Sequence, residues 1–559
     1  MSKNILTAWQ RLIGLLRLDK RDVFQVFYYA IFGGLVNLSL PLGIQAIINL
    51  IQGAQVSTSW IVLVFFVTLG VAFVGVLQLM QIRIIENIQQ KIFTRASFEF
   101  AYRFPKIKMR ELHNSYPPEL ANRFFDVLNI QKGLSKLLLD FPASLLQIIF
   151  GLLLLSFYHP FFIIYGILLL ALIYVVFKFT IEKGLETSLV ESKHKYKTAH
   201  WIQEVARSIV SFKLSGRTSH ALGKTDGLVE KYLDAREGHF KILVLQFIQM
   251  IGFKVLVTAG LLLIGGLLVL NQQMNIGQFV AAEIIILLVI ASVEKLILGL
   301  ESFYDVLTSL EKLGQVVDKE LESQDGESSI REEDGLTIEL DHVSYEVPNM
   351  KRKIIDDISL TITPSCSILL KGPNGSGKST LLRLIAGIAE PTEGNIYVNQ
   401  ASLKGINLNH YRSQMGQSLS EESPFEGTFL DNITFGDTSI SKERINWALE
   451  HTGLARFVKE QPLGLNTVLY PEGKQISFTT AKKIVLARSI VRKPKLLILK
   501  EPLDQFDEEE ANKIMEFLML PEHQWALLVV SQNPKWERHC VRILNLDKGK
   551  LISEIQNNA

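Results

Sequence analysis

The chain has 559 residues, too many for one compact domain, so at least two domains are expected. A hydrophobic content of 48%, a charged fraction of only 20% and a mean hydropathy of +0.23 argue against a wholly soluble protein. The net charge of +2 gives no bulk electrostatic basis for nucleic-acid binding. The two cysteines, Cys366 and Cys540, argue against a disulfide framework and fit a reducing cytosol.

The first segment of the chain, 6–18, is amphipathic and carries Arg11 and Arg17. It is interpreted either as an elbow helix on the cytoplasmic membrane face or as the plain start of the next helix. No signal peptide with a short apolar core and a small-residue cleavage site is visible.

Six apolar stretches then have the length of about 20 residues that a membrane-spanning helix needs. They are residues 23–50, 59–82, 137–157, 160–180, 243–270 and 277–300. The short turns after the first, third and fifth stretches contain neither Lys nor Arg, whereas long basic segments follow the second and fourth. The positive-inside rule therefore places these long segments and both termini in the cytoplasm.

Charge is costly within a membrane span and suggests function. Lys254 lies in the fifth predicted span, and Glu283 and Glu294 lie in the sixth. The helical rise puts Lys254 about 24 Å and Glu294 about 28 Å from the outer end, so the two are expected to pair, as a functional site or as a contact between helices. Glu283, about 12 Å deep, has no partner at its level and is expected either to line a cavity or to make a packed polar contact.

An acidic, polar linker, 319–334, separates the predicted membrane domain, 1–318, from a second domain, 335–559. In this second domain an apolar strand ending at Leu370 precedes the pattern G-x-x-x-x-G-K-S, and a helix-like segment follows it. This context is typical of a phosphate-binding loop, or P-loop. Its backbone N–H groups and the helix N-terminus are expected to hold phosphate, with Lys378 on the β- and γ-phosphates and Ser379 offering its hydroxyl to Mg²⁺. The candidate nucleotide-binding residues are Gly372, Pro373, Asn374, Gly375, Ser376, Gly377, Lys378, Ser379 and Thr380.

The downstream motifs resemble those of the ATP-binding cassette (ABC) of ABC transporters. The segments that carry this resemblance are GTFLDNITFG (427–436), IVLARSI (484–490), PKLLIL (494–499) and LNLDKGK (544–550). Together with the six spans, they resemble an ABC exporter half-transporter. The membrane half is most similar to the bacterial peptide and toxin secretion branch, through SLPL (39–42) and GQFV (277–280).

The resemblance implies an α-helical membrane domain of six transmembrane helices, of the ABC exporter type, fused to an α/β P-loop NTPase cassette. It implies ATP and Mg²⁺ as cofactors, the lipid bilayer of the bacterial inner membrane as surroundings, and a second half-transporter chain as partner. It also places a first coupling helix, which would touch a cassette, at 116–126.

Residue-by-residue transfer of the family motifs exposes several departures. Lys500 stands where the family has its Mg²⁺-binding aspartate, which puts Mg²⁺ in doubt, whereas Glu501 keeps the place of the general base. In the signature motif the serine survives as Ser477, but Phe478 and Thr479 replace two glycines. Gln532 replaces the switch histidine, Ser420 stands at the Q-loop glutamine and Val347 at the adenine-stacking aromatic position.

The sequence therefore predicts an ABC-type exporter subunit that acts as a dimer, retains nucleotide binding and has impaired hydrolysis. A homodimer is favoured, a heterodimer is the alternative, a periplasmic adaptor is a possible further partner and nucleic acid is not one. The rival hypothesis is a non-transporting ABC-fold scaffold or nucleotide-gated regulator. Lys500 is expected either to point beside Ser379 as a built-in cation or to turn away toward Glu501 or Asp504.

Overall fold

The computed structural model describes residues 7–52, 58–324, 326, 335–347 and 352–557. The chain divides into two compact units, one formed by Met1–Pro105 and Ser115–Lys319 and the other by Lys106–Asn114 and Glu320–Ala559. Most of the predicted linker lies outside the described residues.

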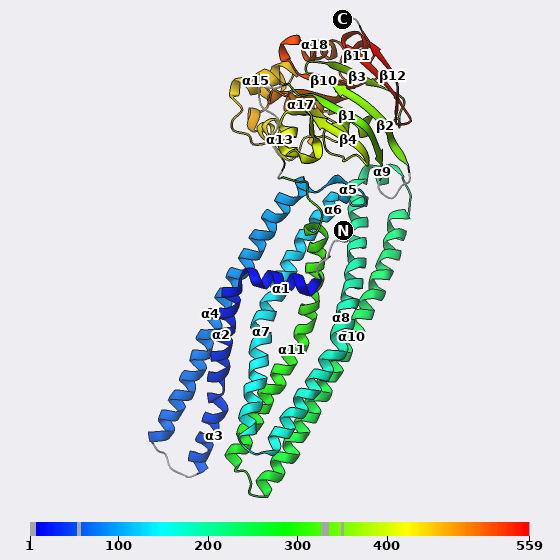
Figure 1. Cartoon of the computed structure of the whole chain (residues 1–559). Helices are drawn as coiled ribbons and strands as arrows, with labels where there is room; N and C mark the ends of the chain where they lie inside the picture. The colour runs from blue at the N-terminus through cyan, green and yellow to red at the C-terminus, as the bar shows by residue number, and fades with distance from the viewer. Residues whose placement is uncertain (1–6, 53–57, 325, 327–334, 348–351, 558–559) are drawn as a thin grey trace. The chain divides into compact units, whose positions relative to one another are not determined.

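The first unit is a bundle of long helices (Figure 1). Six helical segments of the described chain are long and apolar enough to cross a membrane, which confirms the six predicted spans. The helices of the unit are α1 (Ala8–Leu18), α2 (Lys20–Asn37), α3 (Ser39–Gln52), α4 (Thr58–Arg103), α6 (Pro117–Ala121), α7 (Asp126–Ser156), α8 (Phe161–Arg207), α9 (Ile209–Leu214), α10 (His220–Leu270) and α11 (Ile276–Val317), with a 3₁₀ turn, η2 (Asn122–Phe125), before α7.

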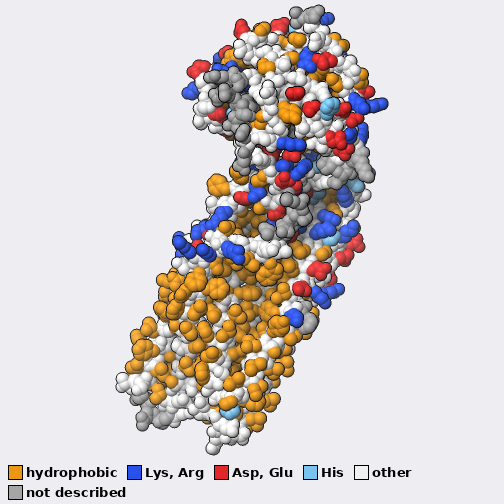
Figure 2. Space-filling view, in the orientation of Figure 1, with side chains coloured by type: hydrophobic (Ala, Val, Ile, Leu, Met, Phe, Trp, Pro, Cys, Tyr) orange, Lys and Arg blue, Asp and Glu red, His pale blue; other side chains and the backbone are white. Residues whose placement is uncertain are grey.

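Close packing between α7 and α11 forms the centre of the bundle. A Cβ atom added to Gly133 on α7 would come within 2.4 Å of Val306 on α11, so the small residue permits this approach. Other apolar side chains point outward, and Figure 2 shows them covering most of the visible length of the bundle, with charged side chains gathered beyond them. An exposed apolar surface of this extent is typical of helices that face lipid.

Two charged contacts within the bundle answer questions that the sequence raised. Lys254 Nζ lies 2.6 Å from Glu294 Oε2, which confirms the predicted pair. The N-terminal segment is a helix of its own, α1, separate from the first span. Its Arg11 forms an ion pair with Asp318, directly after α11, so the positive charge of Arg11 is paired within the protein.

The second unit is an α/β cassette built on two main sheets (Figure 1). One sheet has the order β2-β1-β4-β5, and the other, whose inner strands are parallel, has the order β12-β11-β3-β10-β9-β6. The strands are β1 (Ile338–Glu346), β2 (Lys353–Ile362), β3 (Ser367–Lys371), β4 (Glu393–Val398), β5 (Ala401–Ser402), β6 (Met415–Ser418), β7 (Gly427–Thr428), β8 (Val468–Leu469), β9 (Leu496–Lys500), β10 (Ala526–Val530), β11 (Arg542–Asp547) and β12 (Lys550–Gln556). The helices are α5 (Met109–Leu112), α12 (Lys378–Ile385), α13 (Leu408–Ser413), α14 (Phe429–Thr434), α15 (Lys442–His451), α16 (Ala455–Lys459), α17 (Phe478–Val491), α18 (Glu508–Leu518) and α19 (Lys535–His539).

A short segment from the long connection between the second and third spans belongs to the cassette unit. Ile107 forms a β-bridge with Leu321, and Lys108 Nζ lies 2.8 Å from Glu320 Oε1. Hydrogen bonds from Lys108 and Arg110 lower the pKa of Glu320 to about 2. The segment of this loop that groups with the cassette is therefore Lys106–Asn114, and the predicted coupling-helix segment, 116–126, groups with the helical unit.

The orientation of the helices can be tested by cysteine labelling. In a background with Cys366 and Cys540 replaced by Ser, Arg207→Cys on the second long loop should resist an impermeant maleimide in intact spheroplasts and react after permeabilisation. Asn271→Cys, in the short exposed turn between α10 and α11, is the matched control and should react in intact spheroplasts. Labelling of Arg207→Cys from the outside would overturn the predicted topology.

Candidate functional site

The candidate site begins with the P-loop, which joins β3 to α12. Gly372, Gly375 and Gly377 have φ angles of 147°, 81° and 107°, a range that side chains disfavour. A Cβ atom on Gly372 would lie 2.0 Å from the carbonyl oxygen of Leu546, so glycine is also required sterically. The predicted loop is therefore present in the conformation for which its glycines are needed.

Lys378 closes over this loop. Its Nζ donates to the carbonyl oxygens of Gly372 at 2.6 Å and Pro373 at 2.9 Å. Burial, and then the nearby Lys500, lower the pKa of Lys378. No carboxylate of the described residues forms an ion pair with this ammonium within 4 Å, so it is available to an anionic ligand.

A cavity of about 530 Å³ opens beside the P-loop. It is lined by Asn374, Lys378, Lys500, Glu501, Leu503, Asp504, Gln505, Val530, Ser531, Gln532, Asn533 and Trp536. Within the loop itself, the hydroxyl of Ser376 is buried and has no hydrogen-bond partner among the described residues. The cavity, the free lysine and this hydroxyl fit the phosphates of a nucleotide.

Lys500 ends β9 and points at the P-loop. Its Nζ donates a hydrogen bond of 2.7 Å to Ser379 Oγ, the hydroxyl that the resemblance assigned to Mg²⁺. Of the two positions that the sequence left open, the structure therefore has the one beside Ser379. Within the described part of the chain, no group of three or more His, Cys, Asp or Glu side chains could hold a metal ion.

Glu501 is held in a constrained position next to Lys500. Its φ of 43° is unusual for a residue with a side chain. Its Oε2 accepts hydrogen bonds from Ser531 Oγ at 3.2 Å and from the backbone N–H of Gln532 at 3.4 Å. The carboxylate thus keeps a fixed place in the cavity, beside Gln532.

Lys482 is a contributor that the sequence analysis missed. From the second turn of α17 its Nζ donates to the backbone carbonyl oxygen of Glu501 at 2.6 Å. Burial lowers the pKa of this lysine. Only its spacing after Ser477 on α17 could have pointed to it, because the contact joins segments 19 residues apart through the fold.

The signature segment forms the N-terminus of α17. Ser477 is the N-cap, and its Oγ accepts from the backbone N–H of Thr480 at 3.1 Å. This hydroxyl also hydrogen-bonds Thr479 Oγ1 at 2.9 Å. Phe478, the first helical residue, is 54% exposed, so a bulky apolar side chain stands at the position that the resemblance assigned to a glycine.

The remaining two sequence-predicted positions do not line the cavity. Val347 directly follows β1 and borders residues outside the described part of the chain. Ser420 is exposed just after β6, whereas Gln417 lies within that strand with its Oε1 buried and unpartnered among the described residues. The structure therefore brings together the P-loop, Lys500, Glu501 and Gln532, and leaves these two apart.

Comparison with known proteins places both units in one family. Residues 23–293 match the ABC transporter transmembrane region, and residues 355–504 match the ABC transporter family, which includes the P-loop and Lys500. A solved structure described as a bacterial Atm1-family ABC exporter with ATP bound superposes with a TM-score of 0.84 over 96% of this chain and 95% of that chain. At 17% sequence identity, this similarity concerns the fold.

Curated relatives include two bacterial membrane proteins. The chain is 31% identical over 285 residues to an ATP-dependent lipid A-core flippase of Burkholderia orbicola, covering 51% of this chain and 48% of the flippase. It is 26% identical over 318 residues to the alpha-hemolysin translocation ATP-binding protein HlyB of Escherichia coli, covering 56% and 45%. The chain spans about half the length of these curated relatives.

Removing the P-loop ammonium tests whether the cavity holds nucleotide. Lys378→Ala should weaken ATP binding by about tenfold or more, because hydrogen bonds to a charged group contribute about 1.5–3 kcal/mol and each 1.4 kcal/mol is tenfold in affinity. Equilibrium binding of a fluorescent ATP analogue to the purified chain measures the effect. The matched control is Lys459→Ala, an exposed lysine on α16. Equal affinity of wild type and Lys378→Ala would mean that the P-loop does not bind nucleotide.

Proposed function

We propose that this chain is a transporter subunit with impaired ATP hydrolysis. It belongs to the ABC transporter family in both of its units, and its membrane region is fused to its cassette as in an exporter half. It binds ATP, works as a dimer in the bacterial inner membrane, and exports a substrate that its sequence does not identify. The observation that carries the proposal is the intact P-loop with Lys500 hydrogen-bonded to Ser379.

Nucleotide binding is supported by the residues around the P-loop. Lys378 and Lys500 bring two positive charges to the cavity, and the α12 N-terminus adds backbone N–H groups. Phosphate oxygens would replace the two backbone carbonyls that Lys378 now binds. Lys500 would offset part of the phosphate charge that a metal ion normally offsets.

Impaired hydrolysis follows from the same residues. Lys500 is a cation and cannot ligate Mg²⁺, whose octahedral geometry aligns the phosphates during phosphoryl transfer. Gln532 cannot exchange a proton as histidine does near neutral pH. Glu501 is still present as a general base, but it stands in a site without the expected metal ligand.

The partner is a second half-transporter chain, with a homodimer favoured over a heterodimer. In the family, the signature segment of one cassette completes the site of the other. Here Phe478 and Thr479 would hinder that approach, so pairing with a competent subunit does not obviously restore turnover. A periplasmic adaptor remains a possible further partner, since one relative is named for hemolysin translocation.

The alternative is a non-transporting scaffold or nucleotide-gated regulator built on the same fold. The altered Lys500, Phe478 and Gln532 positions favour it equally, because a regulator needs to bind nucleotide without turning it over. Reconstitution in lipid vesicles distinguishes the two. ATP-dependent movement of a labelled lipid or peptide across the vesicle membrane supports the exporter, and saturable ATP binding without movement supports the regulator.

Turnover itself provides the direct test of impairment. The reconstituted chain should bind ATP but release phosphate no faster than Glu501→Gln, a variant that removes the remaining general base with little change in shape. If wild type released phosphate at least tenfold faster than this variant, Glu501 would catalyse hydrolysis, and the proposal that ATP hydrolysis is impaired would be wrong.

If Lys500 acts as a built-in cation, ATP binding should depend little on Mg²⁺. ATP affinity of wild type should be similar in EDTA and in excess Mg²⁺, since Lys500 supplies the positive charge. Lys500→Asp should bind ATP weakly in EDTA and more tightly, by about tenfold, in Mg²⁺. Fluorescence titrations of both proteins under both conditions measure this. A strong Mg²⁺ dependence in wild type would contradict the role of Lys500.

Lys500→Asp also tests whether the changes at the signature and switch positions limit ATP turnover. Lys500→Asp restores a carboxylate but leaves Phe478, Thr479 and Gln532 in place, so ATP turnover should stay close to that of wild type. Phosphate release is measured on the reconstituted variant with Mg²⁺. Full ATPase activity from this single change would show that the signature and switch positions contribute little.

A further inference from the structure

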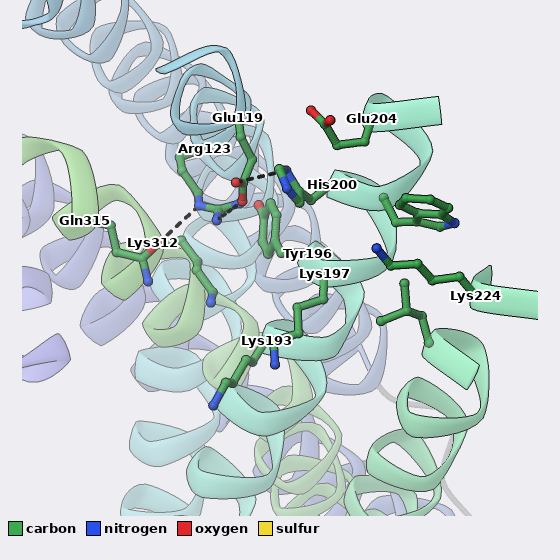
Figure 3. A pocket seen from close by; sticks show the side chains of 12 residues that line it. Glu119, Arg123, Lys193, Tyr196, Lys197, His200, Glu204, Lys224, Lys312 and Gln315 are labelled. Carbon is green, nitrogen blue, oxygen red and sulfur yellow. Dashed lines mark hydrogen bonds and ion pairs between the residues drawn. The ribbon is translucent and has the colours of Figure 1, made fainter. Parts of the chain in front are cut away.

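A second cavity lies in the helical unit, far along the chain from the P-loop. Its volume is about 530 Å³, and α6, η2, α8, α10 and α11 contribute its walls (Figure 3). Its lining residues are Glu119, Arg123, Lys193, Tyr196, Lys197, His200, Trp201, Glu204, Lys224, Leu228, Lys312 and Gln315. Five of these side chains are lysine or arginine and two are glutamate, so the cavity has a positive balance.

The two carboxylates already have partners. Glu119 forms ion pairs with Arg123 at 3.0 Å and with His200 Nδ1 at 3.2 Å. Glu204 pairs with Arg207, with N and O atoms 2.7 Å apart. These acids therefore leave Lys193, Lys197, Lys224 and Lys312 without a carboxylate among the described residues within ion-pair distance.

Lys312 is the least expected of these cations, because lysine is rarely buried without a counter-ion. Its exposed fraction is 7%, and no hydrogen bond or ion pair joins its Nζ to any residue that the structure describes. Its Nζ lies 5.3 Å from the centroid of the Tyr196 ring. Asp126 is nearby, but its carboxylate accepts from Tyr196 Oη and from Ser309 Oγ, and it forms no ion pair with Lys312. The buried ammonium thus has capacity for a ligand.

Arg123 also has a free donor in this cavity. The side chain is buried, with Nη2 on Glu119 and Nε on Gln315 at 3.2 Å. Its Nη1 is buried and has no hydrogen-bond partner among the described residues. Figure 3 shows Arg123 and Lys312 next to Tyr196, with Lys193 and Lys197 on the neighbouring turns of α8. Two buried cations and two exposed ones therefore surround one space.

The aromatic side chains in the cavity are already covered by cations. The Arg123 guanidinium lies 3.7 Å from the centroid of the Tyr196 ring, and Lys224 Nζ lies 3.9 Å from the Trp201 ring. On each ring, the face that carries the cation is not free to stack on a nucleobase or another flat ring. The ligand is therefore recognised by its charge.

The helical rise places the cavity well outside the lipid. Tyr196 lies 35 residues after the start of α8, and Lys312 lies 36 residues after the start of α11. Each of these helices starts directly after a short turn from the preceding long helix. At 1.5 Å per residue these positions are about 50 Å along their helices, whereas the hydrocarbon core is about 30 Å thick. A lipid headgroup at the membrane surface would remain about 20 Å away.

We propose that this cavity is a binding site for a soluble anion with several phosphate groups. Lys312 and Arg123 Nη1 hold one phosphate at the buried end, and Lys193 and Lys197 hold further charge toward solvent. The volume of about 530 Å³ exceeds that of a single phosphate ion, which favours a polyphosphate or a multiply phosphorylated metabolite. Such a ligand would bridge α8 and α11 through ion pairs.

Binding of inorganic triphosphate to the full chain tests the site independently of the cassette. All proteins carry Lys378→Ala, which weakens the contribution of the P-loop equally in each, and no metal is added. The chain should bind radiolabelled triphosphate, and Lys312→Gln should weaken binding by about tenfold, as expected for the loss of a charged hydrogen bond. Lys231→Gln, an exposed lysine on α10 outside the cavity, is the matched control and should bind normally.

A second variant keeps the test valid where Lys312→Gln fails to fold. Lys193→Gln combined with Lys197→Gln changes only exposed residues and should also weaken binding by about tenfold or more. Equal binding by this pair, or by folded Lys312→Gln, and the Lys231→Gln control would overturn the site, as would no binding at millimolar triphosphate.

Two competition arms identify the source of the anion. In nanodiscs of phosphatidylglycerol, triphosphate should bind as it does in phosphatidylcholine. Loss of binding in phosphatidylglycerol would assign the cavity to a lipid headgroup and overturn the soluble ligand. A glutamate-rich peptide should compete more weakly than triphosphate does, and tighter binding of the peptide would mean that the cavity receives a protein segment.

Discussion

Lys500 Nζ donates a hydrogen bond of 2.7 Å to Ser379 Oγ at the point where β9 ends beside the P-loop. This contact puts a fixed positive charge next to the hydroxyl that would otherwise face a divalent cation. Since like charges repel, the ammonium and Mg²⁺ compete for one place. The proposed properties of the cassette follow from this competition: phosphate is still attracted, and the metal geometry needed for turnover is lost.

The other departures in the cassette agree with that interpretation. Phe478 and Thr479 begin α17 in ordinary helical geometry, so the signature segment is folded but presents side chains in place of bare backbone. Glu501 is held by Ser531 and the Gln532 backbone, which preserves its position whether or not hydrolysis occurs. The proposed impairment thus concerns a cassette with a well-ordered site that, by its resemblance to the family, lacks several groups that turnover requires. It suits a subunit in which bound nucleotide stabilises one conformation.

The parts of the structure that could be predicted from the sequence are those with local signals. The spans could be predicted because a run of about 20 apolar residues matches the thickness of a bilayer, and the P-loop because its spacing fell between a strand and a helix. Helical rise alone was enough to pair Lys254 with Glu294. The motif alignment located Lys500 at the end of a strand next to the P-loop but left its direction open, and the structure has its Nζ on Ser379 Oγ.

Contacts between segments distant in the chain could not be predicted in this way. The basic residues of the second long loop predict the cytoplasmic side, but nothing local indicated that Lys193 and Lys197 line one cavity with Lys312, more than 100 residues later. The contact between Lys482 and the Glu501 carbonyl and the grouping of Lys106–Asn114 with the cassette also depend on tertiary packing. Hydropathy and motif spacing carry no information about such packing.

The central claim, that Lys500 takes the place of the metal, is tested most directly by an experimental structure of the chain with a non-hydrolysable ATP analogue in excess Mg²⁺. The account predicts Lys500 Nζ within about 3 Å of a phosphate oxygen and still hydrogen-bonded to Ser379 Oγ, as for other charge-assisted hydrogen bonds. An octahedral Mg²⁺ about 2 Å from Ser379 Oγ, with the Lys500 side chain displaced, would contradict it.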